Sequence, residues 1–296
     1  MKVQETTAQS ILTESKLPDA DYVVNPYTGC QFGCSYCYAS FMGRFVKEPI
    51  ESWGDYLYVK INAVELFERD FARLKSSGKT PSILLSSVTD PYQGPEKQYE
   101  LSRGILKILA RDNYQGLVSI LTKSPLVLRD IDVLREIPQV EVGLTITTTD
   151  DKISRFLEVR APLASTRIET LRSLHNAGIP TYAFIGPLLP HFRYETEELD
   201  KLFGAVASTG TRRVFVEHIN LKQYIRQRLW PELEGLPEHV RNIYREATGQ
   251  EHRDALQRVI DILLAKHHLE LRLNRVLYHE ADKKQSKQSA KVEVDR

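Results

Sequence analysis

Short apolar runs alternate along this chain with longer amphipathic segments. Residues 82–86 and 141–148 are short and rich in aliphatic or β-branched side chains, which is typical of buried strands. Residues 61–75 and 165–177 instead space their apolar positions three and four apart, which is typical of helices. Gly178 follows the second of these segments and gives it a normal C-terminal stop. The chain is therefore predicted to mix strands and helices throughout.

Strand and helix segments follow one another six times. The predicted strands cover residues 22–25, 82–86, 117–122, 141–148, 181–185 and 213–217, and the predicted helices cover residues 61–75, 101–110, 125–134, 165–177 and 194–207. This order favours an α/β fold with a parallel sheet and outer helices. Six units are too few to close an eight-stranded barrel. The pattern alone permits either a partial barrel or a doubly wound sheet.

The pattern changes after residue 220. Residues 236–268 predict two helices, with Trp230-Pro231 read as a break before them, and residues 269–277 predict a closing strand. We therefore expect an N-terminal extension over 1–20, a main α/β unit over 21–220, a helical and strand extension over 221–280, and a disordered tail over 281–296. The tail is rich in Lys, Gln and Ser and has too little apolar surface to fold.

All the cysteines of the chain lie in one loop after the first predicted strand. Cys30, Cys34 and Cys37 form a compact C-x3-C-x2-C spacing that suits a single metal centre. Iron–sulfur clusters are held by cysteine thiolates, and full ligation of a cubane takes four. Three thiolates therefore leave one iron open to a small molecule. Gly29 and Gly33 allow the backbone to fold tightly around such a cluster.

A zinc site and a disulfide are the alternatives for these cysteines. Structural zinc takes four ligands, and the nearest histidine downstream is His175, so no local Cys3His finger is available. An odd number of cysteines and the expected reducing compartment argue against disulfides. The spacing favours the iron–sulfur cluster over zinc.

The cysteine loop and two later segments resemble a known family. The loop NPYTGCQFGCSYCYA, residues 25–39, resembles the signature of the radical S-adenosylmethionine (SAM) superfamily. SSVTDPYQ at 86–93 and FLEVRAP at 156–162 resemble its spore photoproduct lyase-like branch. The resemblance implies the superfamily's partial (β/α)6 TIM-like barrel, a [4Fe-4S] cluster on Cys30, Cys34 and Cys37, and SAM on the open iron.

The resemblance also implies a chemistry. One electron from the reduced cluster cleaves a sulfonium C–S bond of SAM, and the resulting 5′-deoxyadenosyl radical abstracts hydrogen from the substrate. The electron is expected from a reducing partner of the flavodoxin or ferredoxin type. Tyr36 and Tyr38 are the predicted catalytic residues, because the branch pairs tyrosines here that can relay a radical.

Polar residues follow the predicted strands at their carboxyl ends, where parallel β/α folds bind ligands. With support from the resemblance, the predicted SAM-binding residues are Ser86, Ser87, Thr89, Asp90, Lys123, Thr147, Glu158 and Arg167. Lys123 is expected to pair with the SAM carboxylate as a point charge. Arg167 is expected to pair either with Glu158 or with that carboxylate. Tyr92 and His218 are weaker candidates, since a single histidine at a strand end is usually part of the scaffold.

The substrate is not specified by these motifs. Spore photoproduct lyase repairs a thymine dimer in DNA with the help of a cysteine after its second strand, and Ser87 stands at the apparent equivalent position. An O–H bond is much stronger than an S–H bond, so serine cannot replace that hydrogen donor. The net charge of +1, from 40 basic and 39 acidic residues, gives no overall attraction to nucleic acid.

The sequence therefore predicts a radical SAM enzyme that acts on an unidentified small molecule, peptide or nucleic acid. DNA photoproduct repair is one alternative, and a zinc-stabilised, non-catalytic nucleic-acid-interaction protein is another. The first 15 residues lack the pattern of a signal peptide, and no apolar run approaches the ~20 residues of a membrane span. We expect a soluble cytoplasmic protein without membrane contact.

Overall fold

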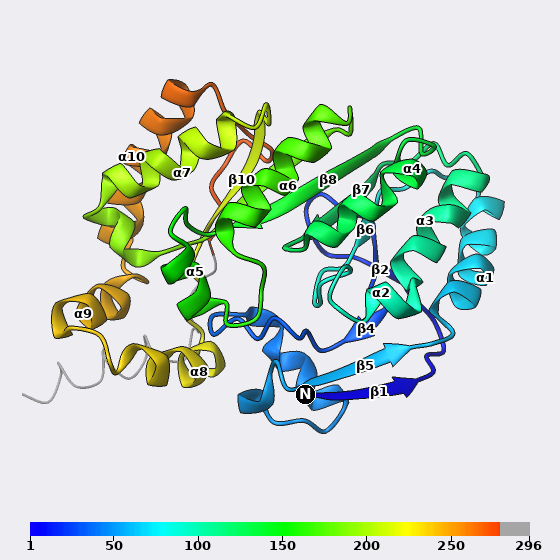
Figure 1. The fold of residues 1–296 in the computed structure, drawn as a ribbon, viewed down its shortest axis with the longest axis horizontal. Coiled ribbons are helices and arrows are strands. Elements are labelled where there is room, and N and C mark those ends of the chain that lie inside the picture. The colour runs from blue at the N-terminus through cyan, green and yellow to red at the C-terminus, as the bar shows by residue number, and fades with distance from the viewer. Residues whose placement is uncertain (279–296) are drawn as a thin grey trace, which may run out of the picture.

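The computed structural model describes residues 1–278, and a curved eight-stranded sheet forms its centre (Figure 1). The strand order is β11-β10-β9-β8-β7-β6-β3-β2. All neighbours pair in parallel except β2 and β3. The six strands that carry the β/α units are β3 (Tyr22–Val24), β6 (Ile83–Leu85), β7 (Val118–Thr122), β8 (Val140–Ile146), β9 (Thr181–Leu188) and β10 (Arg213–His218).

These six strands lie side by side in sequence order, as a barrel requires. A doubly wound sheet reverses its strand order at a switch point, and no reversal occurs from β3 to β10. The partial (β/α)6 barrel is therefore confirmed, and the doubly wound alternative is wrong. The carboxyl ends of the six strands meet at one rim, where the predicted site residues fall.

Helices on the outer side of the sheet connect the strands (Figure 1). They are α1 (Ala63–Ser76), α2 (Glu96–Tyr99), α3 (Leu101–Arg111), α4 (Ile131–Leu134), α6 (Ala164–Asn176) and α7 (Thr196–Ala207). The predicted helix over 125–134 is divided into a 3-10 helix, η3 (Pro125–Asp130), and α4. A short helix, α5 (Asp151–Leu157), was not predicted. It begins at Asp150, whose carboxylate accepts from the Lys152 and Ile153 amides at 2.6 and 3.3 Å.

The predicted N-terminal extension over 1–20 contributes strands to two sheets. β1 (Lys2–Thr6) pairs in parallel with β5 (Tyr56–Lys60), and β4 (Tyr27–Thr28) completes this small sheet. β2 (Leu12–Glu14) pairs antiparallel with β3 at the edge of the central sheet. β4 leads directly into the cysteine loop, so the small sheet supports that loop from below.

The C-terminal segment contains one helix more than predicted. α9 (Glu238–Glu246) and α10 (Gln250–His267) confirm the two predicted helices, but α8 (Gln223–Leu233) precedes them. Pro231 lies inside α8 rather than breaking the chain before a helix. Burial of Ile225, Leu229 and Leu233 at intervals of four stabilises α8.

The predicted closing strand over 269–277 is shorter than expected. It is reduced to β11 (Glu270–Leu271) and a single bridge between Glu217 and Leu277. The predicted disordered tail, 281–296, lies outside the described residues. None of the helices within residues 1–278 combines the length and apolar character that crossing a membrane demands.

The barrel interior is filled in part by one aromatic ring. Tyr182 on β9 is buried, and its hydroxyl donates to the Ile120 carbonyl on β7 at 3.1 Å. Its ring crosses β8 at Gly143, where a Cβ atom would overlap the ring. The glycine thus allows Tyr182 to reach across a neighbouring strand.

We predict that Gly143→Ala destabilises the fold by about 1–3 kcal/mol, because the added methyl group forces the Tyr182 ring out of its position. Chemical denaturation measures this change. Gly235→Ala is the matched control, since a Cβ there meets nothing within 4 Å among the described residues. Equal stability of the two variants would contradict the proposed packing.

Candidate active site

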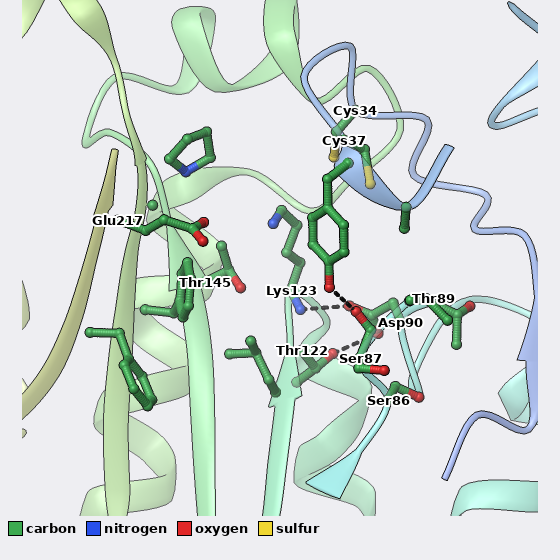
Figure 2. A pocket seen from close by; sticks show the side chains of 18 of the residues that line it. Cys34, Cys37, Ser86, Ser87, Thr89, Asp90, Thr122, Lys123, Thr145 and Glu217 are labelled. Atoms are coloured by element: carbon green, nitrogen blue, oxygen red, sulfur yellow. Dashed lines mark hydrogen bonds between the residues drawn. The ribbon is translucent and has the colours of Figure 1, made fainter. Parts of the chain in front are cut away.

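A cavity of about 320 Å³ opens at the carboxyl ends of the barrel strands. This volume lies within the range of small-molecule sites. The cysteine loop covers one end, and the loops after β6 and β7 and the ends of β8, β9 and β10 supply the walls. Figure 2 shows Cys34 and Cys37 at one end, with Glu217 across the cavity from Ser87 and Asp90.

Most of the predicted site residues are brought together here. Those that line the cavity are Cys30, Cys34, Tyr36, Cys37, Tyr38, Ser86, Ser87, Thr89, Asp90 and Lys123. Thr147, Glu158 and Arg167 are buried and are not among its lining residues.

Glycines set the sharp path of the cysteine loop. Gly29 has a φ of +95°, and a Cβ there would come within 2.6 Å of the Tyr56 carbonyl oxygen on β5. Gly33 has a φ of +65° and packs against Gly54, where a Cβ would lie 2.7 Å from the Gly33 Cα. The Thr89 hydroxyl donates to the Gly29 carbonyl at 2.5 Å. The loop is therefore fixed both to the small sheet and to the loop after β6.

The three thiols are free, and the loop presents all of them to the cavity. Burial raises the pKa of Cys30, Cys34 and Cys37, so iron would have to displace their protons on binding. Within residues 1–278, no group of His, Cys, Asp or Glu converges on a single ion, as tetrahedral zinc requires. The thiolates of a cubane bind different irons and need not converge. The donor set fits a cluster.

The loop after β6 begins with a strained residue. Ser86 has a φ of +66°, which is unusual for a residue other than glycine and costs about 1–3 kcal/mol. Its buried hydroxyl has no hydrogen-bond partner in the part of the chain that the structure describes. Such an orphaned polar atom in the wall of a cavity is what a polar ligand would satisfy.

Asp90 joins the ends of two strands. Its carboxylate accepts from the Tyr92 amide at 2.9 Å, the Thr122 hydroxyl at 2.7 Å and the Lys123 amide at 2.8 Å. Burial raises the pKa of Asp90, and these donors oppose the shift. The carboxylate thus holds Lys123 in place at the end of β7 and is largely occupied by the protein itself.

Glu158 and Arg167 form a buried ion pair behind the cysteine loop. Arg167 is 0% exposed and donates to Glu158, to the Pro162 carbonyl at 2.7 Å and to the Thr145 carbonyl at 3.2 Å. Burial opposes ionisation of Glu158, but the charges of Arg167 and Lys123 outweigh it and lower its pKa to about 2. Of the two roles predicted for Arg167, the structure shows the pairing with Glu158.

This ion pair positions two residues of the cavity wall. The Tyr36 hydroxyl donates to Glu158, and the Lys123 ammonium lies 3.7 Å from the same carboxylate. The ammonium also lies 5.9 Å from the centre of the Tyr36 ring. Glu158 therefore orients both side chains from outside the cavity.

Comparison with known proteins decides the family. Residues 24–203 match the sequence profile of the Radical SAM superfamily. The chain belongs to the radical SAM superfamily. Membership implies an iron–sulfur cluster and SAM as cofactors, and it implies an enzyme. The cysteine loop and the loop after β6 both lie within the matched region.

Relatives of this radical SAM protein occur in archaea and bacteria. It is 34% identical over 222 residues to "Uncharacterized protein MJ0683" of Methanocaldococcus jannaschii. The aligned region covers 75% of this chain and 79% of that relative. It is 29% identical over 273 residues to "Uncharacterized protein Rv2578c" of Mycobacterium tuberculosis. That aligned region covers 86% of this chain and 78% of the relative.

Two solved structures share the fold of this chain. Spore photoproduct lyase complexed with dinucleoside spore photoproduct superposes with a TM-score of 0.70 at 15% identity, covering 95% of this chain and 82% of the other. Streptococcus suis SuiB bound to precursor peptide SuiA superposes with a TM-score of 0.54 at 13% identity, covering 88% of this chain and 48% of the other. At these identities the likeness concerns the fold alone.

Three further predicted residues donate to, or pack against, other parts of the protein. The Tyr38 hydroxyl donates to the Ser87 carbonyl and so connects the cysteine loop to the loop after β6. The hydroxyl of the fully buried Tyr92 donates to Asp130 at 3.0 Å, away from the cavity lining. Burial lowers the pKa of His218 to about 4, so it is a neutral core residue.

Sequence reasoning missed several residues of this radical SAM site. Thr145 and Glu217 line the cavity; both end predicted strands, and neither was among the predicted ligands. The apolar wall of Tyr182, Phe184 and Phe215 looks like ordinary barrel core in the sequence. Residues 17–19 also line the cavity, although nothing in their composition connects them with the cysteine loop.

We predict that Glu158→Gln lowers the free energy of unfolding by about 3–5 kcal/mol at pH 7, because it leaves Arg167 buried without a counter-charge. Folding lowers the pKa of Glu158 from 4.5 to about 2. The ionised carboxylate therefore stabilises the protein fully above about pH 4.5, and this contribution is lost as the pH falls towards 2.

Urea unfolding at a series of pH values measures this effect. The difference between wild type and Glu158→Gln should narrow as the medium becomes acidic. Glu169→Gln is the control, because its ion pair with Arg172 is exposed and contributes about 1 kcal/mol or less. A difference that stays constant down to acidic pH would argue against the ionised pair.

Proposed function

We propose that this protein is a radical SAM enzyme that holds one [4Fe-4S] cluster on Cys30, Cys34 and Cys37 and abstracts hydrogen from a substrate in the adjoining cavity. When bound, the cluster and SAM supply the electron and the 5′-deoxyadenosyl radical for this reaction. The observation that carries the proposal is the shared cavity. The three free thiols, the orphaned Ser86 hydroxyl and the Lys123 cation all line it.

The residues of this cavity divide into ligand contacts and positioning residues. We assign Lys123 to the SAM carboxylate, since its ammonium provides a positive charge in the wall. We assign Ser86 and Ser87 to the ammonium or ribose of SAM. Thr89 and Asp90 hold the loops around the ligand through their hydrogen bonds to Gly29, Thr122 and Lys123, and we propose them as positioning residues.

Buried residues behind the wall support these contacts. Glu158 and Arg167 position Tyr36 and Lys123, and Thr147 packs at the end of the neighbouring strand β8. We propose that Thr147, Glu158 and Arg167 do not bind SAM directly, because they are buried and do not line the cavity. Tyr36 and Tyr38 lie on either side of Cys37, where they can relay a radical.

The apolar wall suits radical chemistry. Tyr182, Phe184 and Phe215 line the part of the cavity inside the barrel. Apolar side chains exclude water and side reactions from a reactive intermediate. We propose that the reacting group of the substrate occupies this part of the cavity.

The charges of the wall bear on the substrate class. Among the described residues that line the cavity, Lys123 is the only lysine or arginine, whereas Asp19, Asp90 and Glu217 are acidic. Phosphodiester backbones are bound by clusters of Lys and Arg. The wall therefore supports a small molecule or a peptide over DNA. We propose that a flavodoxin or ferredoxin type of protein supplies the electron in the reducing environment of the cytoplasm.

DNA photoproduct repair is the second candidate. The fold shared with spore photoproduct lyase favours it. Ser87 in place of a thiol hydrogen donor, together with the single basic residue of the wall, disfavours it. The zinc-stabilised alternative receives no support from the ligand geometry of residues 1–278.

We predict that Cys34→Ala abolishes cluster binding and formation of 5′-deoxyadenosine from SAM, while the protein remains folded. Two thiols cannot retain the cluster, and removing a single buried sulfur atom leaves only a small cavity that the fold tolerates. Iron and acid-labile sulfide analysis, and chromatography of the nucleoside, measure the result after oxygen-free reconstitution. Arg44→Ala, an exposed change in the following segment, is the control. Continued 5′-deoxyadenosine formation by Cys34→Ala would refute the assignment.

We predict that Ser87→Cys does not confer repair of spore photoproduct in a DNA oligonucleotide. The variant restores a thiol, but the cavity wall still lacks the basic residues that hold DNA. Conversion of the photoproduct back to two adjacent thymines in the strand is measured by chromatography of the digested oligonucleotide, with wild type in parallel. Repair by the variant alone would establish the second candidate and show that only the hydrogen donor is missing.

A further inference from the structure

Helix α8 reaches the cysteine loop through a single arginine. Arg228 Nη1 donates to the carbonyl oxygens of Cys34 at 2.9 Å and Ser35 at 3.4 Å. Arg228 Nη2 donates to the carbonyl oxygens of Trp53 at 3.2 Å and Gly33 at 3.4 Å. One guanidinium therefore connects the middle of the C-x3-C-x2-C loop to the turn that packs beneath it.

A second contact lies one turn earlier on the same helix. The Tyr224 hydroxyl donates to the Tyr38 carbonyl at 3.1 Å. Residues four apart on a helix share one face, so Tyr224 and Arg228 hold the loop on both sides of Cys37. Helix α8 belongs to the C-terminal segment, beyond residues 24–203 that match the superfamily profile.

All four hydrogen-bond acceptors of Arg228 within residues 1–278 are neutral carbonyl oxygens. The carboxylate that interacts with it electrostatically, Glu232, lies one turn later on the same helix. Arg228 is half-buried, and it lies close enough to the thiols of Cys37 and Cys34 to interact with them electrostatically. Arginine stays protonated in proteins. A fixed positive charge therefore sits beside the cysteine loop.

We propose that Arg228 is a positioning residue that holds the cysteine loop in its ligand-binding conformation and whose charge favours the reduced form of the cluster. The inference rests on the proposed function. The external reductant gives one electron to the cluster, and no proton or bond is exchanged at Arg228. The added negative charge is stabilised by the neighbouring guanidinium, which raises the reduction potential.

Three variants separate the two parts of this role. Arg228→Met removes both the charge and the hydrogen bonds, and Arg228→Lys keeps the charge but cannot span four carbonyls. Arg226→Met is the matched control, because it removes a charge from the same helix at a position that points away from Arg228. Each variant is reconstituted without oxygen and titrated with reductant while the EPR signal of the reduced cluster is followed.

We expect the midpoint potential of Arg228→Met to be more negative than that of wild type, with Arg228→Lys and Arg226→Met close to wild type. Hydrogen exchange of the iron-free proteins is expected to be faster at residues 33–38 in both Arg228 variants and unchanged in Arg226→Met. This second measurement needs no cluster, so it decides the positioning role even if a variant does not retain iron.

Unchanged exchange at residues 33–38 in both Arg228 variants would overturn the positioning role. An Arg228→Met cluster with the wild-type potential would overturn the electrostatic role. Failure of wild type itself to bind iron and sulfide would instead overturn the proposed function, and the exchange experiment would still report on the contact between α8 and the loop.

Discussion

The structure depends on holding three thiols of one short loop against the open end of a barrel. A free loop of this length would lose conformational entropy on binding a metal cluster, and the fold reduces that cost in advance. Gly33 and Gly54 allow two backbone turns to touch, and Thr89 ties the start of the loop to the neighbouring strand end. Arg228 holds the middle of the loop through hydrogen bonds to the Cys34 and Trp53 carbonyl oxygens. The loop thus holds its three thiols in place before a cluster binds, and three separate parts of the chain support it.

The buried ion pair extends this support into the cavity wall. Arg167 and Glu158 satisfy each other out of contact with solvent, and Glu158 in turn holds Tyr36 and Lys123. A charge at the end of a long side chain is a poor ligand unless it is oriented. The pair gives Lys123 that orientation without entering the cavity itself. Buried polar residues can therefore serve the site from behind its wall.

Much of the fold was predictable from the sequence because the parallel strands are buried on both faces. Their short apolar runs, and the periodic helices between them, identify the six β/α units. Helix α8 was missed because Pro231 suggested a break, whereas burial of its apolar face stabilises a helix through that position. The short strands β1 and β5 were missed because their pairing joins segments some fifty residues apart in the sequence, and local patterns contain no such information.

The site likewise has residues that the sequence predicted and residues whose roles it did not specify. The cysteines, the strand-end hydroxyls and Lys123 were predicted to lie together and do line one cavity, because the carboxyl ends of parallel strands meet at one rim. The positioning roles of Asp90 and Arg167 depend on which atoms meet in three dimensions, and the sequence alone left a role as ligand open. Arg228 lies almost two hundred residues beyond the loop that it holds, so no motif could connect them.

The proposed chemistry depends on one iron of the cluster that has no protein ligand and is open to SAM. The most direct measurement is the EPR spectrum of the reduced, oxygen-free protein before and after addition of SAM. We expect the signal of a reduced four-iron cluster whose g values change when SAM is added. A protein that shows no iron–sulfur signal, or one whose signal is unaffected by SAM, would contradict it.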